Sequence, residues 1–165
     1  MTILGIPLFE LLRASVALFV IVDPIGLVPV FVGLTKDMKP EQRRRTFSVV
    51  VGTGTLLLLL FALLGQQILQ LFGITLHSFM IAGGILLLIL SIQSLLSGRW
   101  VEKNVTADDM GIVPMAFPLL VGPGAITAIL ITLQTSGIVV ALLSIFIVMI
   151  LTWLIFAVVD RIHAL

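Results

Sequence analysis

The stretch ASVALFVIVDPIGLVPVFVGL, residues 14–34, decides the fold because it is almost wholly apolar and carries a single charge, at Asp23. A helix rises about 1.5 Å per residue, so about 20 apolar residues cross a hydrocarbon core of roughly 30 Å. Within this stretch Asp23-Pro24-Ile25-Gly26 interrupts the helix, because proline lacks an amide N–H and clashes with the preceding turn. We therefore predict a membrane-crossing helix that is broken near its middle.

A second apolar stretch, residues 112–136, carries a similar break at Gly122-Pro123-Gly124. Broken backbone frees polar groups that hydrocarbon cannot satisfy, so it is tolerated only where it is buried in protein or lines a polar cavity. Paired breaks of this kind form the solute sites of many transporters. The two breaks together predict a solute site.

The composition of the 165 residues indicates an integral membrane protein. Hydrophobic residues make up 60% and charged residues only 10%, against about 25% charged in soluble domains. We expect one all-α, multi-pass transmembrane domain over residues 1–165. No cysteine is present, which excludes disulfides and thiolate metal sites, and the net charge of +1 argues against a nucleic-acid partner. The five predicted crossings lie near 6–35, 46–72, 75–97, 112–136 and 138–160.

Basic residues in the connectors predict the orientation of these crossings. Lys36, Lys39 and the run Arg43 to Arg45 separate the first two segments, Arg99 and Lys103 separate the third and fourth, and Arg161 follows the fifth. Basic loops remain on the cytoplasmic side of a membrane. The N-terminus is thus expected outside and the C-terminus of this chain in the cytoplasm.

The two broken segments correspond at an offset of 99 residues. The matched pairs are Ala17 and Ala116, Val22 and Val121, Pro24 and Pro123, and Leu34 and Leu133. Three crossings separate the two copies, so the copies run in opposite directions, as in an inverted-topology repeat. The prediction is two inverted three-helix repeats, about 6–97 and 112–165, the second without its last helix.

Asp23 is the acidic residue deepest in a predicted segment. It suits the cap of a restarted helix, with Pro24 at the first helical position. It is also a candidate partner for an ammonium group, a cation or a proton, since ionisable residues at such depth are functional candidates. The amides of the half-helices near Gly26 and Gly124 would hold a carboxylate. Two roles are open for the Thr127 hydroxyl, which bonds either a substrate or the carbonyl freed by proline.

Three further features complete the expectations. Glu10 and Arg13 are three residues apart and suit a helical ion pair. Gly83-Gly84 suits close helix packing. No catalytic residues are expected, because only Asp23 lies deep enough and acid–base catalysis normally needs a second group.

Three motifs resemble the MarC family of bacterial and archaeal inner-membrane proteins. They are Val22-Asp23-Pro24-Ile25-Gly26-Leu27-Val28-Pro29-Val30-Phe31; Phe72-Gly73-Ile74 followed by Ile81-Ala82-Gly83-Gly84-Ile85; and Val113-Pro114 through Ala116, Pro118-Leu119 and Gly122-Pro123-Gly124-Ala125-Ile126-Thr127. Members have six helices with the N-terminus outside. The resemblance implies substrate-binding roles for Asp23, Pro24, Gly26, Pro29, Gly122, Pro123, Gly124 and Thr127.

The resemblance also implies a function. It favours a multi-pass inner-membrane transporter of small solutes, with neutral amino acids as the expected substrates, working by alternating access. No cofactor is expected, although a proton or a cation is a candidate coupling ion. Two alternatives remain open: an exporter of ions or drugs, and a non-transporting membrane interaction protein. The lipid bilayer is an expected partner, and a homo-oligomer is a further possibility.

Overall fold

The computed structural model describes residues 2–3, 6–36, 38–97 and 111–163. Its elements, in chain order, are β1 (Thr2–Ile3), β2 (Ile6–Pro7), α1 (Leu8–Val22), α2 (Pro24–Thr35), α3 (Pro40–Leu71), α4 (Leu76–Ser97), the π-helix η1 (Gly111–Leu120) and α6 (Pro123–His163). The two strands form one short antiparallel pair ahead of α1. The chain is otherwise helical over the described residues, as predicted. The basic residues Arg99 and Lys103 lie outside the described residues.

Helix starts and stops follow local sequence signals. Pro40 occupies the first turn of α3, and the Lys39 amide donates to Gln42 Oε1 at 3.1 Å. α3 therefore begins before residue 46, where the predicted crossing began. It ends at Leu71, and Gly73 follows two residues later with a positive φ of 63°, which suits a residue without a side chain. Thr75 Oγ1 then accepts the Ser78 amide at 3.1 Å and caps α4.

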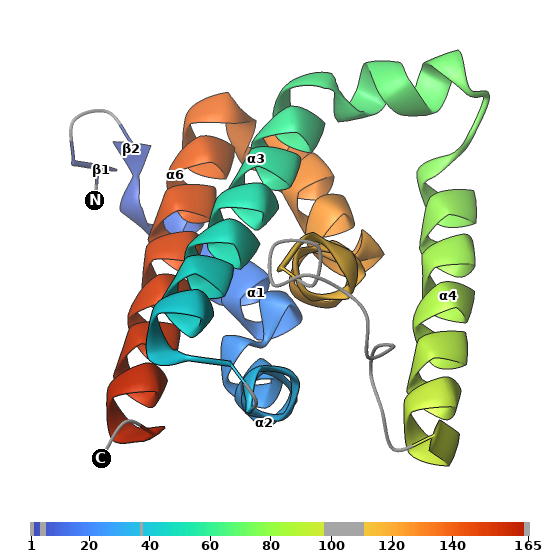
Figure 1. Ribbon diagram of the computed structural model, residues 1–165. Coiled ribbons are helices and arrows are strands. Elements are labelled where there is room, and N and C mark those ends of the chain that lie inside the picture. The colour runs from blue at the N-terminus through green and yellow to red at the C-terminus, as the bar shows by residue number, and fades with distance from the viewer. Residues whose placement is uncertain (1, 4–5, 37, 98–110, 164–165) are drawn as a thin grey trace.

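α6 contains the fourth segment's second half and the whole fifth segment. Its 41 residues would extend about 60 Å if straight, twice the hydrocarbon thickness. Gly137 breaks the helix with φ 85° and ψ 171°. The two halves of α6 run in different directions in Figure 1, the lighter orange half before the turn and the red half after it. The predicted boundary between residues 136 and 138 is therefore confirmed.

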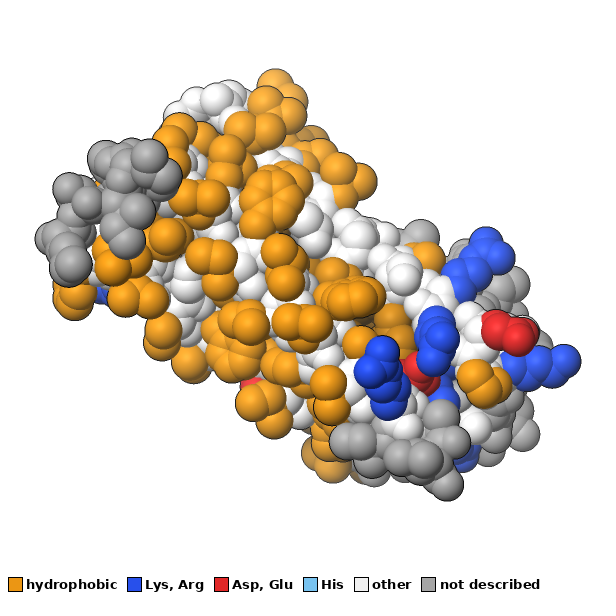
Figure 2. All heavy atoms as spheres, turned by 90° about the vertical axis from the view of Figure 1, so that its left-hand side faces the viewer, with side chains coloured by type: hydrophobic (Ala, Val, Ile, Leu, Met, Phe, Trp, Pro, Cys, Tyr) orange, Lys and Arg blue, Asp and Glu red, His pale blue; other side chains and the backbone are white. Residues whose placement is uncertain are grey.

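The described part of the chain has four helical stretches long and apolar enough to cross a membrane: Leu8–Thr35, Pro40–Leu71, Leu76–Gln93 and Pro123–Arg161. The last is broken at Gly137. Its part after Gly137 matches the fifth predicted crossing, whereas the 14 residues from Pro123 to Ser136 rise only about 21 Å, so the fourth predicted crossing also needs η1. Apolar side chains cover most of the face shown in Figure 2, and most of the visible charged side chains gather at one end. This distribution fits a bilayer around the apolar belt.

The core lies between α1, α3 and α6. Leu18 of α1, Leu58 of α3 and Ile145 of α6 are each at most 1% exposed. Toward the charged end, three phenylalanine rings from α2, α3 and α6 stack: Phe31 lies 4.1 Å from Phe47 and 5.2 Å from Phe156, between ring centroids. α4 stands apart from α1 and α2 in Figure 1 and packs on α6.

Candidate functional site

The first break lies at Asp23, where α1 ends and α2 begins. Asp23 adopts the left-handed conformation, with φ 44° and ψ 58°, which aspartate tolerates better than most residues. Its amide donates to the Phe19 carbonyl at 2.9 Å and closes α1. Its side-chain Oδ1 accepts the Gly26 amide at 3.0 Å and caps α2. The predicted capping role of Asp23 is confirmed, and the residue is exposed.

Gly26 owes its identity to this cap. A β-carbon at Gly26 would overlap the Asp23 carboxylate and lie 2.8 Å from its Cγ. The Gly26 amide, which we expected to be free for a substrate carboxylate, is therefore already bonded to Asp23. Oδ2 is the Asp23 oxygen that this cap leaves available.

Two prolines shape the first break. Pro24 is buried at the first position of α2, and Pro29 lies inside α2 with its ring exposed. Because Pro29 has no amide N–H, the carbonyl of Ile25 loses its helical donor. The first turn of α2 thus keeps an acceptor that the helix itself does not use.

The second break separates η1 from α6. Pro118 lies inside η1 and has no amide N–H to donate to the residue four before it. The Val121 amide donates to the Ala116 carbonyl at 2.9 Å, and this five-residue spacing is that of a π-helix. Gly122 follows, and the Ile126 amide donates back to its carbonyl at 3.2 Å. Gly122 has no side chain with which to cap α6. The amides of Gly124 and Ala125 precede the first helical hydrogen bond and point toward the break.

The two breaks lie close together. A β-carbon at Gly124 would lie 3.1 Å from Ile21 Cγ2, and Ile21 is two residues before Asp23. From the other side, a β-carbon at Gly83 of α4 would overlap the Pro123 ring. α1 contacts α6, and α2 contacts η1. In the predicted inverted repeat α1 corresponds to η1 and α2 corresponds to the start of α6, so the repeat would relate these two contacts to each other. The repeat itself stays a prediction.

Thr127 lies one turn into α6 and is 4% exposed. Its hydroxyl has no hydrogen-bond partner, so it does not bond the carbonyl freed by proline. By contrast, Thr132 and Thr152 of the same helix both bond the carbonyl four residues before, at 2.8 Å. Buried hydroxyls are normally paired. Of the two roles expected for the Thr127 hydroxyl, the structure therefore does not show the hydrogen bond to a backbone carbonyl.

A groove of about 420 Å³ runs between α1 and the first half of α6. Its lining includes Glu10, Arg13, Ala17 and Ile21 from α1 and Ala128, Thr132, Thr135 and Ser136 from α6. Ser136 Oγ donates to Glu10 Oε2 at 2.9 Å, so the expected Glu10–Arg13 ion pair is replaced by this bond. The groove begins beside this pair and reaches Ile21 and Ala128, which are neighbours of Asp23 and Thr127 in sequence. It leads from one end of the bundle toward the breaks.

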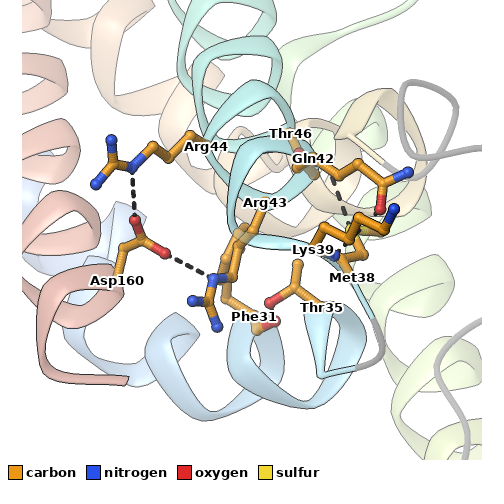
Figure 3. Close-up of polar contacts among 9 residues, drawn as sticks. All are labelled: Phe31, Thr35, Met38, Lys39, Gln42, Arg43, Arg44, Thr46 and Asp160. Carbon is orange, nitrogen blue, oxygen red and sulfur yellow. Dashed lines mark hydrogen bonds and ion pairs between the residues drawn. The ribbon is translucent and has the colours of Figure 1, made fainter. Parts of the chain in front are cut away.

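Sequence reasoning missed one charged cluster. Asp160 near the end of α6 is 4% exposed. Arg43 Nε donates to its Oδ1 at 2.6 Å and Arg44 Nε donates to its Oδ2 at 3.1 Å, as Figure 3 shows. The carboxylate joins the start of α3 to the end of α6. Among the described residues, no three acidic or histidine side chains are grouped to hold a metal ion.

Comparisons with known proteins agree with this architecture. A family model described as MarC family integral membrane protein matches residues 8–165. A UPF0056 membrane protein of Pyrococcus abyssi is 38% identical over 133 residues, which cover 76% of this chain and 66% of that protein. A second, from Methanocaldococcus jannaschii, is 37% identical over 128 residues, 73% of this chain and 62% of the relative.

A bacterial relative is the UPF0056 membrane protein YhcE of Escherichia coli, 38% identical over 122 residues, or 68% of this chain and 56% of the relative. The matched part of this chain thus spans between 56% and 66% of the length of these three proteins. No solved structure matches the chain.

Proposed function

Since the chain belongs to the MarC family of integral membrane proteins, we propose that it forms part of an inner-membrane transporter for small zwitterions, with neutral amino acids as the substrate class. The start of α6 carries this proposal. It combines a glycine cap that has no side chain with the buried Thr127 hydroxyl, which has no partner. A polar ligand that enters the break would satisfy both.

The substrate carboxylate belongs at the start of α6 rather than at the start of α2. The Gly124 and Ala125 amides and the positive end of the helix dipole favour an anion there. Because Gly124 has no side chain, Ile21 of α1 approaches the start of α6 closely. At the start of α2 the Asp23 carboxylate already fills the equivalent place, and its second oxygen suits an ammonium group. A zwitterion matches this pair of unlike helix starts.

Alternating access would then expose the site to each side in turn, as one repeat rocks against the other. The groove between α1 and α6 would serve as the path from the outer side, given the orientation predicted from the basic connectors. Asp23 would also carry a coupling proton or cation. The proposal assigns the chain no catalytic activity and no cofactor.

Thr127→Val tests the binding role. Valine has nearly the same shape and removes a hydroxyl that is buried without a partner, so thermal stability is expected to hold or to rise. Loss of one substrate hydrogen bond should weaken amino-acid binding about tenfold. The measurement is the ligand-dependent rise in melting temperature of the purified chain, titrated with neutral amino acids. Thr152→Val is the control, because that hydroxyl is satisfied and lies in the other half of α6. Equal affinities in the Thr127 variant and the unmodified chain would contradict the role.

Asp23→Asn tests the charge separately from the fold. Asparagine caps helices as well as aspartate does, so its side-chain oxygen is expected to keep the Gly26 bond and the break. Uptake driven by a pH gradient in proteoliposomes should be abolished, while melting temperature changes little. Glu41→Gln removes an exposed acid in the first turn of α3, away from both the break and the groove, and serves as the control. Undiminished uptake by the Asn variant would remove Asp23 from the mechanism.

A further inference from the structure

A second cavity lies at the charged end of the bundle, away from the two breaks. Its volume is about 310 Å³, at the lower end of the range for small-ligand sites. α3 contributes Arg44, Phe47 and Ser48, and α6 contributes Trp153, Asp160 and Arg161. We call it the arginine cavity.

The arginine cavity has an excess of positive charge. Asp160 is the acid in its wall. Arg43 and Arg44 bond Asp160, and Arg161, the next residue of α6, also lines the cavity. Arg43 and Arg44 each bond it through Nε, so the terminal nitrogens of Arg44 point away from the carboxylate in Figure 3. Arg44 is 70% exposed, and Arg161 has no ion-pair partner within the described part of the chain. Both guanidinium groups therefore have donors free for an anion.

Part of the wall is apolar and continues into the belt. Trp153 precedes Arg161 by eight residues, or about 12 Å along α6, and its ring is half-exposed. Phe47 is buried in the wall. Ile150 and Leu154 continue the exposed apolar surface of α6 beyond the cavity. A tryptophan about two turns from a basic helix end is typical of the level where lipid head groups meet acyl chains.

We propose that the arginine cavity binds an anionic phospholipid. Its phosphate lies between Arg44 and Arg161, and its acyl chains run along Trp153 onto the apolar face of α6. The Ser48 hydroxyl already donates to the Arg44 carbonyl at 3.2 Å, so charge rather than the hydroxyl selects the ligand. A free phosphate ion would leave the apolar wall uncovered, which favours a lipid over a soluble anion. Basic pockets between membrane helices recognise such head groups.

The test compares binding of phosphatidylglycerol, phosphatidylcholine and inorganic phosphate to the purified chain by native mass spectrometry. Phosphatidylglycerol is expected to be retained, and the other two are not. Arg161→Gln should lower phosphatidylglycerol affinity about tenfold, the effect of one charged contact, and Arg44→Gln should act in the same direction. Lys36→Gln is the matched control, since Lys36 is exposed and does not line the cavity.

A second measurement locates the lipid. The chain has two tryptophans, so Trp100→Phe leaves Trp153 as the reporter. Phosphatidylglycerol with brominated acyl chains should quench its fluorescence more than brominated phosphatidylcholine does, and Arg161→Gln should remove the difference. Equal loss of binding in Lys36→Gln, equal retention of inorganic phosphate, or equal quenching by the two lipids would each overturn the proposal.

Discussion

Gly83→Ala is expected to lower the stability of the protein, whereas Gly84→Ala is expected to raise it. A β-carbon at Gly83 would overlap the Pro123 ring and lie 2.5 Å from its Cβ. A proline ring cannot rotate away, so α4 would have to move, and overpacking of this kind typically costs about 1–3 kcal/mol. At Gly84 nothing lies within 4 Å of the added carbon. The gain in helix propensity then dominates, at up to about 1 kcal/mol.

The measurement is the thermal unfolding midpoint of both variants in the same detergent. The two glycines are neighbours on α4 and receive the same substitution, so membrane insertion and composition are matched. The informative result is which of the two variants has the lower unfolding midpoint, because this depends on which face of α4 packs against the second break. Equal shifts for both variants would show that α4 does not pack on Pro123. Under the proposed function, Gly83→Ala should also weaken substrate binding, since it displaces the start of α6.

The breaks could be predicted from sequence because their cause is local. Proline removes a helical donor wherever it lies, and Asp23 before Pro24 is a helix-cap signal, so both α2 and α6 begin at a proline as expected. The apolar lengths likewise predicted helices long enough to cross a membrane, of which the described part of the chain has four. The family resemblance, based on the residues around these breaks, was confirmed over residues 8–165.

The sequence could not predict which face of one helix packs against the next, because this depends on how each helix is rotated about its own axis in the bundle. Gly83-Gly84 predicted close packing, but only the assembled bundle shows that Gly83 rather than Gly84 meets Pro123. The same holds for Thr127. Its neighbours along α6 follow the common pattern of bonding the preceding turn, and nothing in the sequence marks Thr127 as the exception. The Gly26 amide, expected to be free, was taken by the adjacent carboxylate.

Asp160 was missed although a signal for it existed. Between the start of the second predicted segment and the end of the fifth the chain crosses four times, so Arg43, Arg44 and Asp160 must lie at the same membrane face. An isolated acid at that face beside a basic run is a candidate partner. Asp160 stands out less than Asp23 because it lies at the end of a predicted segment, directly before Arg161.

Asp160→Asn is expected to destabilise the bundle more than removal of either arginine. The substitution leaves two guanidinium groups facing a side chain without charge, and Arg43 is only 14% exposed. Loss of one partner from a buried ion pair costs about 3–5 kcal/mol, and the exposure of Arg44 places the expected cost at the lower end, about 3 kcal/mol. Arg44→Gln removes the exposed arm, leaves the Arg43 bond in place, and should cost no more than about 1 kcal/mol.

The measurement is again the unfolding midpoint, and a double variant separates charge from packing. Replacing both members of the buried pair, with Arg43→Met and Asp160→Leu together, removes both buried charges at once. Such replacements are often neutral, so the double variant should recover much of the stability that Asp160→Asn loses. A double variant as unstable as the single one would show that the cluster acts through shape rather than charge. Because Asp160 joins the start of α3 to the end of α6, the loss should be largest for unfolding of the charged end.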